Sequence, residues 1–372
     1  MGKESIKVLH IDTEKSWRGG QQQVAYLLEA MWSKGYQTAL VCQPQSQIQK
    51  YCAERKFPHF PIRMFSEVDF IAGMRIGWLC RKNGYKILHL HSGHALAIGL
   101  WAKLFYPKLK LIAVRRVDFH INKNWFSRLK YKTRLLNKII CISEAIKKVL
   151  IEDGIPLEKM VTIHSGVDIH KFDGVAPDRN LKQRDEIPSD HLIVGTVAAM
   201  VGHKDYPNLL QAARIVIDRQ DKITFCAVGD GSKKSSILDL ARELGLGKRF
   251  VFAGFQKDIG QFLKLFDIFV LASHLEGLGT SLLDAKAVGL PVIACDTGGI
   301  SEAVIHGKDG LLTPPKNEHA LAEAILMLAN DSELRQKLGA NAQETVKRFD
   351  IQNTVNKNLL LYEDVLASSG AV

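Results

Sequence analysis

Apolar and polar positions form two successive series along the chain, and each series predicts strands separated by amphipathic helices. Short runs of apolar residues predict strands, and apolar residues at intervals of three and four predict the helices between them. The predicted strands are 6–12, 38–42, 87–91, 109–114, 138–142 and 161–164 in the first series, and 192–197, 223–228, 250–252, 268–271 and 291–295 in the second. Strands that alternate with helices are typical of a parallel, doubly wound sheet. The predicted fold class is therefore α/β, with two doubly wound domains.

A polar stretch separates the two series. Residues 168–189 contain two prolines and no apolar period, which indicates an interdomain linker. The expected divisions are an N-terminal domain at 1–170, a linker at 171–190, a C-terminal domain at 191–350 and a final helix at 351–372. The helical end of the chain has no strand partner of its own, so we expect it to cross back and pack on the N-terminal domain. Ligands of such sheets bind beyond the carboxyl ends of the strands.

Composition and charge narrow the class of protein. The chain has 372 residues, of which 46% are hydrophobic and 24% charged, as in ordinary globular proteins. The sequence contains no apolar run of about 18 residues, so we expect no transmembrane helix. Its N-terminus lacks the apolar core of a signal peptide. Residues 1–170 carry 27 Lys/Arg and 13 Asp/Glu, whereas residues 171–372 carry 23 and 26. The basic first half favours an anionic partner, and the six scattered cysteines are expected to be buried, reduced thiols.

Two carboxylates in the second series, Glu276 and Asp284, stand eight positions apart around a glycine-containing turn. Gly277 and Gly279 indicate that the first acid lies on a tight loop and the second inside the helix that follows. A helix that begins after glycines favours anions, because its first N–H groups are free and its dipole is positive there. This segment combines a carboxylate that can bind hydroxyl groups, a phosphate-binding helix start and a second carboxylate. Together they match a nucleotide diphosphate sugar, in which sugar and ribose hydroxyls flank the diphosphate.

Other strand ends carry groups for binding an anion. Gly19 and Gly20 follow the first strand and begin a helix, where the backbone can approach a ligand closely. Lys204 follows the first strand of the second series and suits a phosphate. Arg115 and Arg116 end another strand; arginine stays charged and cannot act as a base, but it binds phosphate or carboxylate well.

His89 and His91 are expected on one face of a strand, because side chains alternate along it. His94 lies just past the strand end. The spacing resembles that of metal ligands, but no partnered Asp, Glu or Cys lies nearby in the sequence, so we expect no metal here. We interpret His91 as a residue of the ligand cleft; a structural histidine is the alternative.

In their order, these segments resemble the retaining GT-B glycosyltransferases of family 4, also called glycosyl transferases group 1. The run 276–284 resembles the family's E-x7-E signature, with Asp284 in place of the second glutamate, and 12–21 resembles its glycine loop. The resemblance extends over about residues 6–350 and implies two Rossmann-like domains that face a central cleft. The other matching runs are 142–145, 164–168, 195–204, 228–231, 252–255, 295–299 and 310–312.

The resemblance implies a hexosyltransferase that moves a sugar from a UDP- or GDP-linked donor to a hydroxyl acceptor, with retention and without a metal or other cofactor. It implies that Glu276 binds hydroxyls of the transferred sugar and that Asp284 binds the ribose. Lys204 and the backbone N–H groups near Gly279 and Thr280 would hold the leaving diphosphate, in place of a divalent metal. The remaining implied positions are Gly19 and Gly20 at the donor, Phe255 and Gln256 at the base, and His91 and Arg115 in catalysis.

The basic half and the resemblance together indicate a glycan, lipid-linked or phosphorylated acceptor, as in cell-envelope glycan or lipopolysaccharide assembly. Residues 123–138 mix cations with Trp125, Phe126 and Tyr131, which suits the surface of an anionic membrane. A core-facing helix with a solvated basic side is the alternative interpretation. We expect a cytoplasmic protein with peripheral membrane contact and no nucleic-acid partner, since no recognition motif accompanies the charge.

Three other functions stay open. A nucleotide-sugar 2-epimerase of the same fold would use cleft groups such as Asp118, His91 and His120, and would need no acceptor. A non-catalytic nucleotide-sugar binding subunit is suggested by Asp284 and by Ala199, which stands where the family has an arginine. An inverting transferase with Asp118 as its base is the third.

Overall fold

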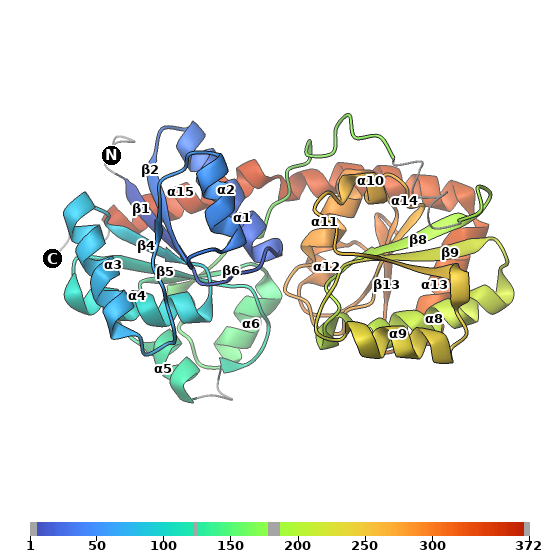
Figure 1. Cartoon of the computed structure of the whole chain (residues 1–372), viewed down its shortest axis with the longest axis horizontal. Coiled ribbons are helices and arrows are strands. Elements are labelled where there is room, and N and C mark those ends of the chain that lie inside the picture. The colour runs from blue at the N-terminus through green and yellow to red at the C-terminus, as the bar shows by residue number, and fades with distance from the viewer. Residues whose placement is uncertain (1–5, 122–124, 178–186, 368–372) are drawn as a thin grey trace. The chain divides into compact units, whose positions relative to one another are not determined.

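The computed structural model describes residues 6–121, 125–177 and 187–367 and divides the chain into two compact units (Figure 1). Unit 1 consists of Met1–Gly166 together with Ile351–Val372, and unit 2 consists of Val167–Asp350. Each unit holds one parallel β-sheet with helices around it, so the predicted α/β class is confirmed. Among the described residues, no helix is long and apolar enough to cross a bilayer.

Unit 1 contains a seven-stranded sheet in the order β3-β2-β1-β4-β5-β6-β7, and all of its strand pairs are parallel. The order reverses between β1 and β4, the position at which ligands bind in open α/β sheets. Its strands are β1 Lys7–Asp12, β2 Gln37–Cys42, β3 His59–Pro61, β4 Ile87–Leu90, β5 Lys110–Arg115, β6 Lys138–Cys141 and β7 Met160–Thr162. Its helices are α1 Gly19–Ser33, α2 Gln47–Glu54, α3 Phe70–Asn83, α4 Gly93–Phe105, α5 Trp125–Lys132, α6 Glu144–Glu152 and α15 Ile351–Ala367, with a 3-10 turn at Leu157–Lys159.

Unit 2 contains a six-stranded parallel sheet in the order β10-β9-β8-β11-β12-β13, which reverses between β8 and β11. Its strands are β8 Leu192–Val197, β9 Ile223–Val228, β10 Phe250–Gly254, β11 Ile268–Leu271, β12 Val292–Cys295 and β13 Gly310–Thr313. Its helices are α8 Tyr206–Arg219, α9 Lys234–Glu243, α10 Gly260–Leu263, α11 Thr280–Ala287, α12 Ile300–Ala303, α13 Glu318–Asn330 and α14 Ser332–Thr345. Short 3-10 turns lie at Gly202–Lys204, Gly247–Arg249 and Val346–Phe349.

Serine caps begin two of the helices that follow strands of unit 1. Ser92 accepts a hydrogen bond from the N–H of Ala95 at 3.0 Å and begins α4. Ser143 accepts one from the N–H of Ile146 at 3.2 Å and begins α6. Such caps satisfy N–H groups that have no partner inside the helix. Each cap follows a strand directly, so the start of the helix is held at the carboxyl end of the sheet.

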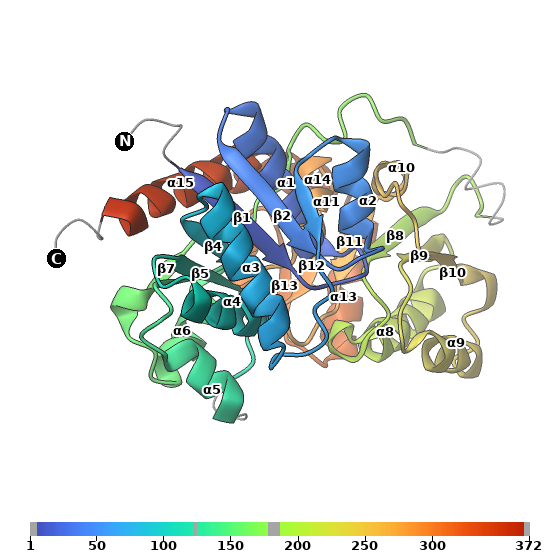
Figure 2. The ribbon, with the colours of Figure 1, turned by 60° about the vertical axis from the view of Figure 1, so that its left-hand side comes forward.

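The last helix, α15, belongs to unit 1 although it is separated from the rest of that unit by all of unit 2. It packs against α1, and Figure 2 shows it beside β1. Thr354 donates a hydrogen bond to the carbonyl of His164 at 2.9 Å. Gly166 has no room for a side chain, since a Cβ there would lie 2.6 Å from the Cα of Ile351. The chain therefore returns to complete unit 1.

Helix α3 packs tightly on α4 through two glycines. A Cβ at Gly73 would lie 2.3 Å from Cβ of Trp101, and one at Gly77 would lie 2.7 Å from the carbonyl of Ala102. The two helices approach closely only because these positions lack side chains. The opposite side of α3 is exposed and carries Ile71, Met74 and Trp78.

Candidate active site

The switch point of unit 2 brings together two residues that the sequence singled out. Lys204 ends the short turn after β8, and Glu276 lies on the loop after β11. These two strands are neighbours in the sheet. The Nζ of Lys204 donates a hydrogen bond to Oε2 of Glu276, an ion pair between residues 72 positions apart. Both side chains are only 15% exposed, so a cation and a carboxylate meet at the edge where ligands of such sheets bind.

Neighbouring groups hold the Glu276 loop in place. Ser273 donates a hydrogen bond to Oε2 of Glu276 at 3.3 Å. The carbonyl of Glu276 accepts one from the N–H of Gly299 at 3.1 Å, which ties this loop to the loop after β12. Thr297 donates to the carbonyl of His274 at 3.0 Å. Neither Ser273 nor Thr297 is marked as a site residue by a local pattern in the sequence, because the contribution of each depends on contacts between loops.

Gly279 shapes the start of α11. Its φ is +78°, in the left-handed region that favours glycine, and a Cβ there would lie 2.8 Å from Cδ1 of Ile300. The helix begins at the next residue, Thr280. The N–H groups of a first helical turn have no partner within the helix and point towards its N-terminal side. The segment after Glu276 thus has the backbone form that the sequence predicted for an anion seat.

A buried ion pair anchors the other end of α11. The Nζ of Lys286 donates to Oδ2 of Asp309 at 2.9 Å and to the carbonyl of Ala303 at 2.6 Å. Both charged side chains are fully buried. Thr345 also donates to Asp309, at 2.6 Å. Removal of one partner would leave a buried charge unpaired, so this network fixes α11 relative to α12 and α14.

Two further glycines bring the loops after β8 and β9 into contact. A Cβ at Gly229 would lie 2.0 Å from the carbonyl oxygen of Ala198, and one at Gly231 would lie 2.4 Å from that of Met200. The N–H of Met200 donates to the carbonyl of Asp230 at 3.0 Å. These contacts support the backbone that leads to Lys204.

Asp284 lies within α11 and is partly buried. Burial raises the pKa of its carboxyl from 3.8 to about 6; Lys171 opposes this rise, and Asp168 adds to it. The carboxyl is therefore ionised at neutral pH, but at the cost of desolvation. An ionised carboxylate accepts hydrogen bonds from hydroxyl groups, so Asp284 could bind them.

The two residues predicted at the nucleotide base lie at the end of β10, two strands from β8. Phe255 is 64% exposed. The side-chain amide of Gln256 donates a hydrogen bond to the carbonyl of Ala253 at 2.7 Å. This bond does not use the backbone N–H or C=O of Gln256. An exposed aromatic ring next to a held backbone is suited to stacking on a base.

The switch point of unit 1 carries the predicted glycine loop. Helix α1 begins at Gly19, and a Cβ at Gly20 would lie 3.7 Å from Cδ of Arg116, in ordinary contact. Arg116 also donates to Oγ of Ser165 at 3.4 Å. Arg115 has a different environment: it donates to the carbonyl of Phe119 at 2.5 Å and lies over the ring of Tyr131. Of the two arginines, Arg116 is the one that contacts the glycine loop.

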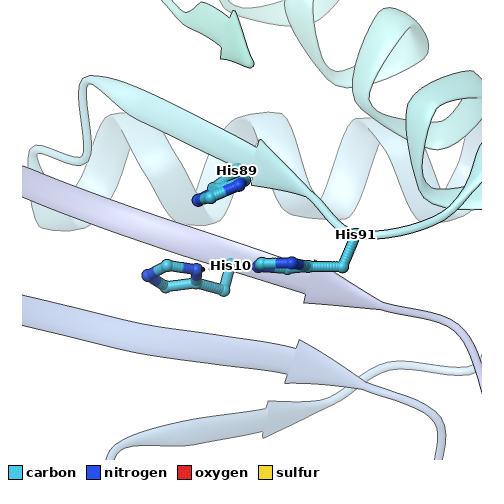
Figure 3. A group of neighbouring side chains, drawn as sticks. All are labelled: His10, His89 and His91. Carbon is cyan, nitrogen blue, oxygen red and sulfur yellow. Dashed lines mark hydrogen bonds between the residues drawn. The ribbon is translucent and has the colours of Figure 1, made fainter. Parts of the chain in front are cut away.

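His91 lies in a cluster with His89 and His10, all on one face of the sheet (Figure 3). The rings of His89 and His91 stack with centroids 4.2 Å apart, as strand alternation predicted for this pair. His10, on β1, was not identified in the sequence, although its place two residues before the end of the first strand could have indicated it. His120, considered as a substitute base, is held by Asp153 at 3.0 Å.

A small cavity adjoins this cluster in unit 1. It has a volume of about 30 Å³ and lies between the sheet, α1 and α15. His89, His91 and Arg116 line it, together with Gln23 and Asn358. Burial lowers the pKa of Arg116 to about 10, and the carboxylate of Asp12 opposes that change. Arg116 therefore remains charged at neutral pH.

In the segment 123–138, which was predicted to contact a membrane, only some of the described side chains are exposed. Trp125 is 75% exposed and Leu129 is 58% exposed on α5. Lys130 and Tyr131 are buried, and Lys130 donates to Glu67 at 2.6 Å and to the carbonyl of Gly93 at 3.1 Å. The side chain of Lys130 therefore belongs to the interior, as in the core-facing alternative, while Trp125 and Leu129 stay exposed. Residues 122–124 lie outside the described residues.

Comparisons with known proteins agree with this geometry. The model "Glycosyltransferase Family 4" matches residues 17–171, and the model "Glycosyl transferases group 1" matches residues 177–345. The chain is 23% identical to the UDP-Gal:alpha-D-GlcNAc-diphosphoundecaprenol alpha-1,3-galactosyltransferase of Escherichia coli over 380 residues, an alignment that covers 98% of each chain. It is 24% identical over 324 residues to the N-acetyl-alpha-D-glucosaminyl L-malate synthase of Bacillus anthracis, covering 85% of this chain and 84% of that one.

A solved structure has the same fold. Anabaena Alr3699/HepE in complex with UDP and glucose superposes with a TM-score of 0.85 at 20% identity, covering 96% of this chain and all of that one. The chain is thus a two-domain enzyme of the GT-B class. It belongs to the family 4, group 1 glycosyltransferases, and it is a glycosyltransferase of the hexosyltransferase type. No finding favours the epimerase alternative.

Proposed function

We propose that this glycosyltransferase takes its sugar from a UDP-linked donor bound at the switch point of unit 2. The observation that carries the proposal is the meeting of Lys204 and Glu276 next to the start of α11. A diphosphate between Lys204 and the first N–H groups of α11 would replace Glu276 as the partner of that lysine. Glu276 would then be free to accept hydrogen bonds from hydroxyls of the sugar.

The same arrangement supports departure of the diphosphate without a divalent metal. Negative charge develops on the leaving diphosphate as the bond to the sugar breaks, and a fixed ammonium with oriented amides stabilises it. Asp284 would hold the ribose, and Phe255 and Gln256 would contact the base. Retention of configuration is the stereochemistry that the resemblance implies.

UDP is proposed over GDP because two of the compared proteins use or hold it. The galactosyltransferase of Escherichia coli is named for a UDP-Gal donor, and the Anabaena structure contains UDP and glucose. The exposed ring of Phe255 and the backbone of Gln256 are the groups in this chain that would contact the base.

Thermal stabilisation by a panel of UDP-, GDP- and ADP-linked sugars tests this donor site, because a ligand that binds only the folded state raises its stability. We expect a shift with UDP-sugars. Lys204→Ala should weaken donor binding roughly ten- to hundred-fold, the usual effect of losing a charged hydrogen bond. Glu276→Gln should retain the folded state and lower transfer by roughly 10²–10³-fold.

Lys222→Ala is the matched control, since Lys222 forms an exposed ion pair with Asp190 just before β9, at the opposite edge of the sheet. That variant should bind the donor like the parent. Transfer that survives addition of EDTA would support metal-independent chemistry. Equal donor binding by Lys204→Ala and the parent, or full transfer by Glu276→Gln, would disprove the proposed site.

We further propose that the acceptor is a lipid-linked glycan and that unit 1 meets it at the cytoplasmic surface of a membrane. The relative from Escherichia coli is named for a diphosphoundecaprenol acceptor, whereas the relative from Bacillus anthracis is named for malate. The exposed side of α3 favours a lipid-linked acceptor over a small soluble acid. Ile71, Met74 and Trp78 recur there at helical spacing and are 47%, 42% and 63% exposed.

Cations lie among these apolar side chains. Arg75, Arg81 and Lys82 are exposed on α3, and the helix contains no acidic residue. Phe65, in the preceding loop, is 76% exposed. A helix with an apolar stripe and basic neighbours binds the surface of an anionic bilayer, where each cation adds about 1 kcal/mol. This surface lies N-terminal to the segment that the sequence indicated.

Flotation with phosphatidylglycerol vesicles and with phosphatidylcholine vesicles tests the membrane proposal. The parent should float with the anionic vesicles and lose that association at high salt. The double variant Ile71→Ser/Trp78→Ser should stay unbound, while Leu360→Ser, which changes an exposed residue of α15, should float like the parent. Equal flotation of all three proteins would exclude α3 as the contact surface.

A further inference from the structure

Three histidines meet inside unit 1, at the switch point of its sheet. His10 on β1 lies opposite His89 on β4, and His91 follows two residues later on the same face. The side chains are 0%, 1% and 6% exposed. Figure 3 shows the three rings gathered over β1 and β4. The described residues around them are those of a protein interior, where an imidazole without partners is costly.

The ring nitrogens converge. One nitrogen from each of the three rings lies within 4.8 Å of the other two. Nδ1 of His10 and Nε2 of His91 are 3.0 Å apart and share a hydrogen bond. Nε2 of His10, Nε2 of His89 and Nδ1 of His91 are buried without a hydrogen-bond partner among the described residues. Buried polar atoms are nearly always satisfied, so the unpartnered Nε2 of His89 in particular is open to a ligand.

One of the three rings has a second partner outside the cluster. Tyr362 on α15 lies 2.5 Å from Nδ1 of His89 and so fixes that ring, leaving Nε2 for a ligand. Metal-binding histidines usually have such a second partner.

We propose that His10, His89 and His91 form a zinc site of three imidazoles. Tetrahedral Zn²⁺ with Zn–N bonds of about 2.0–2.1 Å places its ligand nitrogens about 3.3 Å apart. The spacing between Nδ1 of His10 and Nε2 of His91 is already close to that. The ring of His89, which stacks on His91 and has its ligand nitrogen within 4.8 Å of the other two, would turn its Nε2 towards the ion. Imidazole ligands suit Zn²⁺ and neighbouring transition metals and do not suit Mg²⁺ or Ca²⁺.

The adjoining cavity has room for the fourth ligand. Its volume of about 30 Å³ is enough for one water molecule, and His89 and His91 line it. Binding requires no net release of protons. In the His10–His91 hydrogen bond, one ring carries the proton on the shared side. That ring would change to its other tautomer, with the proton on its second nitrogen, and the lone pairs of Nδ1 of His10 and Nε2 of His91 would then both face the metal.

Charged groups near the cluster act in opposite directions on a bound cation. The charge of Arg116 acts on His89 and His91 and opposes a divalent ion there, whereas the carboxylate of Asp12, which interacts with Arg116, offsets part of that charge. The site would join β1 to β4 and, through Tyr362, to α15. Its role is to stabilise unit 1, separate from the transfer chemistry proposed for unit 2.

Zinc content and metal titration of the full-length protein test this site. Protein stripped with a chelator and then dialysed against Zn²⁺ should retain one equivalent, and its thermal midpoint should rise with Zn²⁺ but not with Mg²⁺. Co²⁺ in place of Zn²⁺ should give the visible absorption of a tetrahedral site. His10→Gln and His89→Gln should lose the retained equivalent.

His94→Gln is the matched control, because His94 lies three residues after His91 and outside the cluster. It should retain the metal. X-ray absorption at the zinc edge of the unmodified protein counts the bound imidazoles, so the test does not depend on the folding of any variant. No retained equivalent, fewer than three imidazoles, or full retention by His89→Gln would overturn the proposal. Donor binding by metal-free protein is measured separately and reports on unit 2 alone.

Discussion

At the scale of single residues, the proposed donor site depends on the ion pair of Lys204 and Glu276. In the unliganded protein each neutralises the other, with Ser273 as a third partner of the carboxylate. In the proposed donor site, a partly buried cation held in this way would be positioned for phosphate before the donor arrives. Glu276 would then exchange the lysine for hydroxyl groups of the sugar.

Asp284→Asn should make the protein more stable at neutral pH and less able to bind its donor. The carboxyl of Asp284 has a pKa of about 6 when folded, against 3.8 for its ordinary value. Between those values the folded protein holds a proton that the unfolded chain has released, so this group's contribution to stability falls as pH rises through about 4 to 6. Above pH 6 the variant should exceed the parent by about 1–2 kcal/mol, allowing for partial exposure.

Chemical denaturation at pH 4 and at pH 7.5 measures this difference. The two proteins should have nearly the same free energy of unfolding at pH 4, where the parent's carboxyl is neutral. A difference that does not change with pH would show that desolvation of Asp284 is not its cause. Donor affinity of the parent should also decline below pH 6, as the carboxylate becomes protonated.

At the scale of elements, α11 is the part of the site most dependent on its surroundings. Gly279 begins it in a left-handed conformation, and the buried pair of Lys286 and Asp309 holds its far half. The helix is eight residues long, too short to be stable alone in water. Its position therefore comes from tertiary contacts, and these direct its first turn.

Gly279→Ala should destabilise unit 2 by about 1–3 kcal/mol and weaken donor binding. The change adds strain at a φ of +78° and a contact of 2.8 Å with Ile300. Gly245→Ala is the matched control: its φ is +64°, but nothing lies within 4 Å of the added Cβ. It should cost about 1 kcal/mol and leave the donor site unchanged. If the two variants bound donor equally well, crowding at α11 would not matter for the site.

At the scale of the whole molecule, the connection of α15 to unit 1 makes the stability of that unit depend on the end of the chain. Tyr362 is fully buried and contacts His89, Thr354 contacts His164, and Asn358 lines the cavity. Unit 1 is complete only after unit 2 has been synthesised. We therefore expect the two units to unfold in separate calorimetric transitions, as is common for multidomain proteins.

Tyr362→Ala should lower only the transition of unit 1, by about 3–5 kcal/mol, because it removes a large buried ring. Leu360→Ala, two residues earlier on the same helix and 61% exposed, should change stability by less than about 0.5 kcal/mol. Differential scanning calorimetry of the two variants measures both effects. A comparable loss in the two variants, or a shift in the transition of unit 2, would contradict the assignment of α15 to the core of unit 1.

The strands were the most predictable part of the fold. The predicted runs 192–197, 223–228 and 268–271 are β8, β9 and β11 with the same bounds, because strands of a parallel sheet covered on both faces are nearly continuous apolar runs. β3 and β13 were missed. β3 is only three residues long at a sheet edge, where none of its side chains is buried, and β13 begins with a glycine, so neither has a distinct pattern.

The sequence by itself determined the class of sheet, the alternation of helix and strand, and the residue types of the donor segment, because periodicity and glycine placement are local properties. Only the tertiary structure decided which of those residues meet. The order of strands places β8 beside β11, and thereby Lys204 beside Glu276. The same is true of His10 with His89, and of Tyr362, which reaches them from 273 residues further along the chain than His89. Such contacts depend on the order of strands in the sheet and on the packing of α15 in unit 1, and a local sequence pattern contains no information on either.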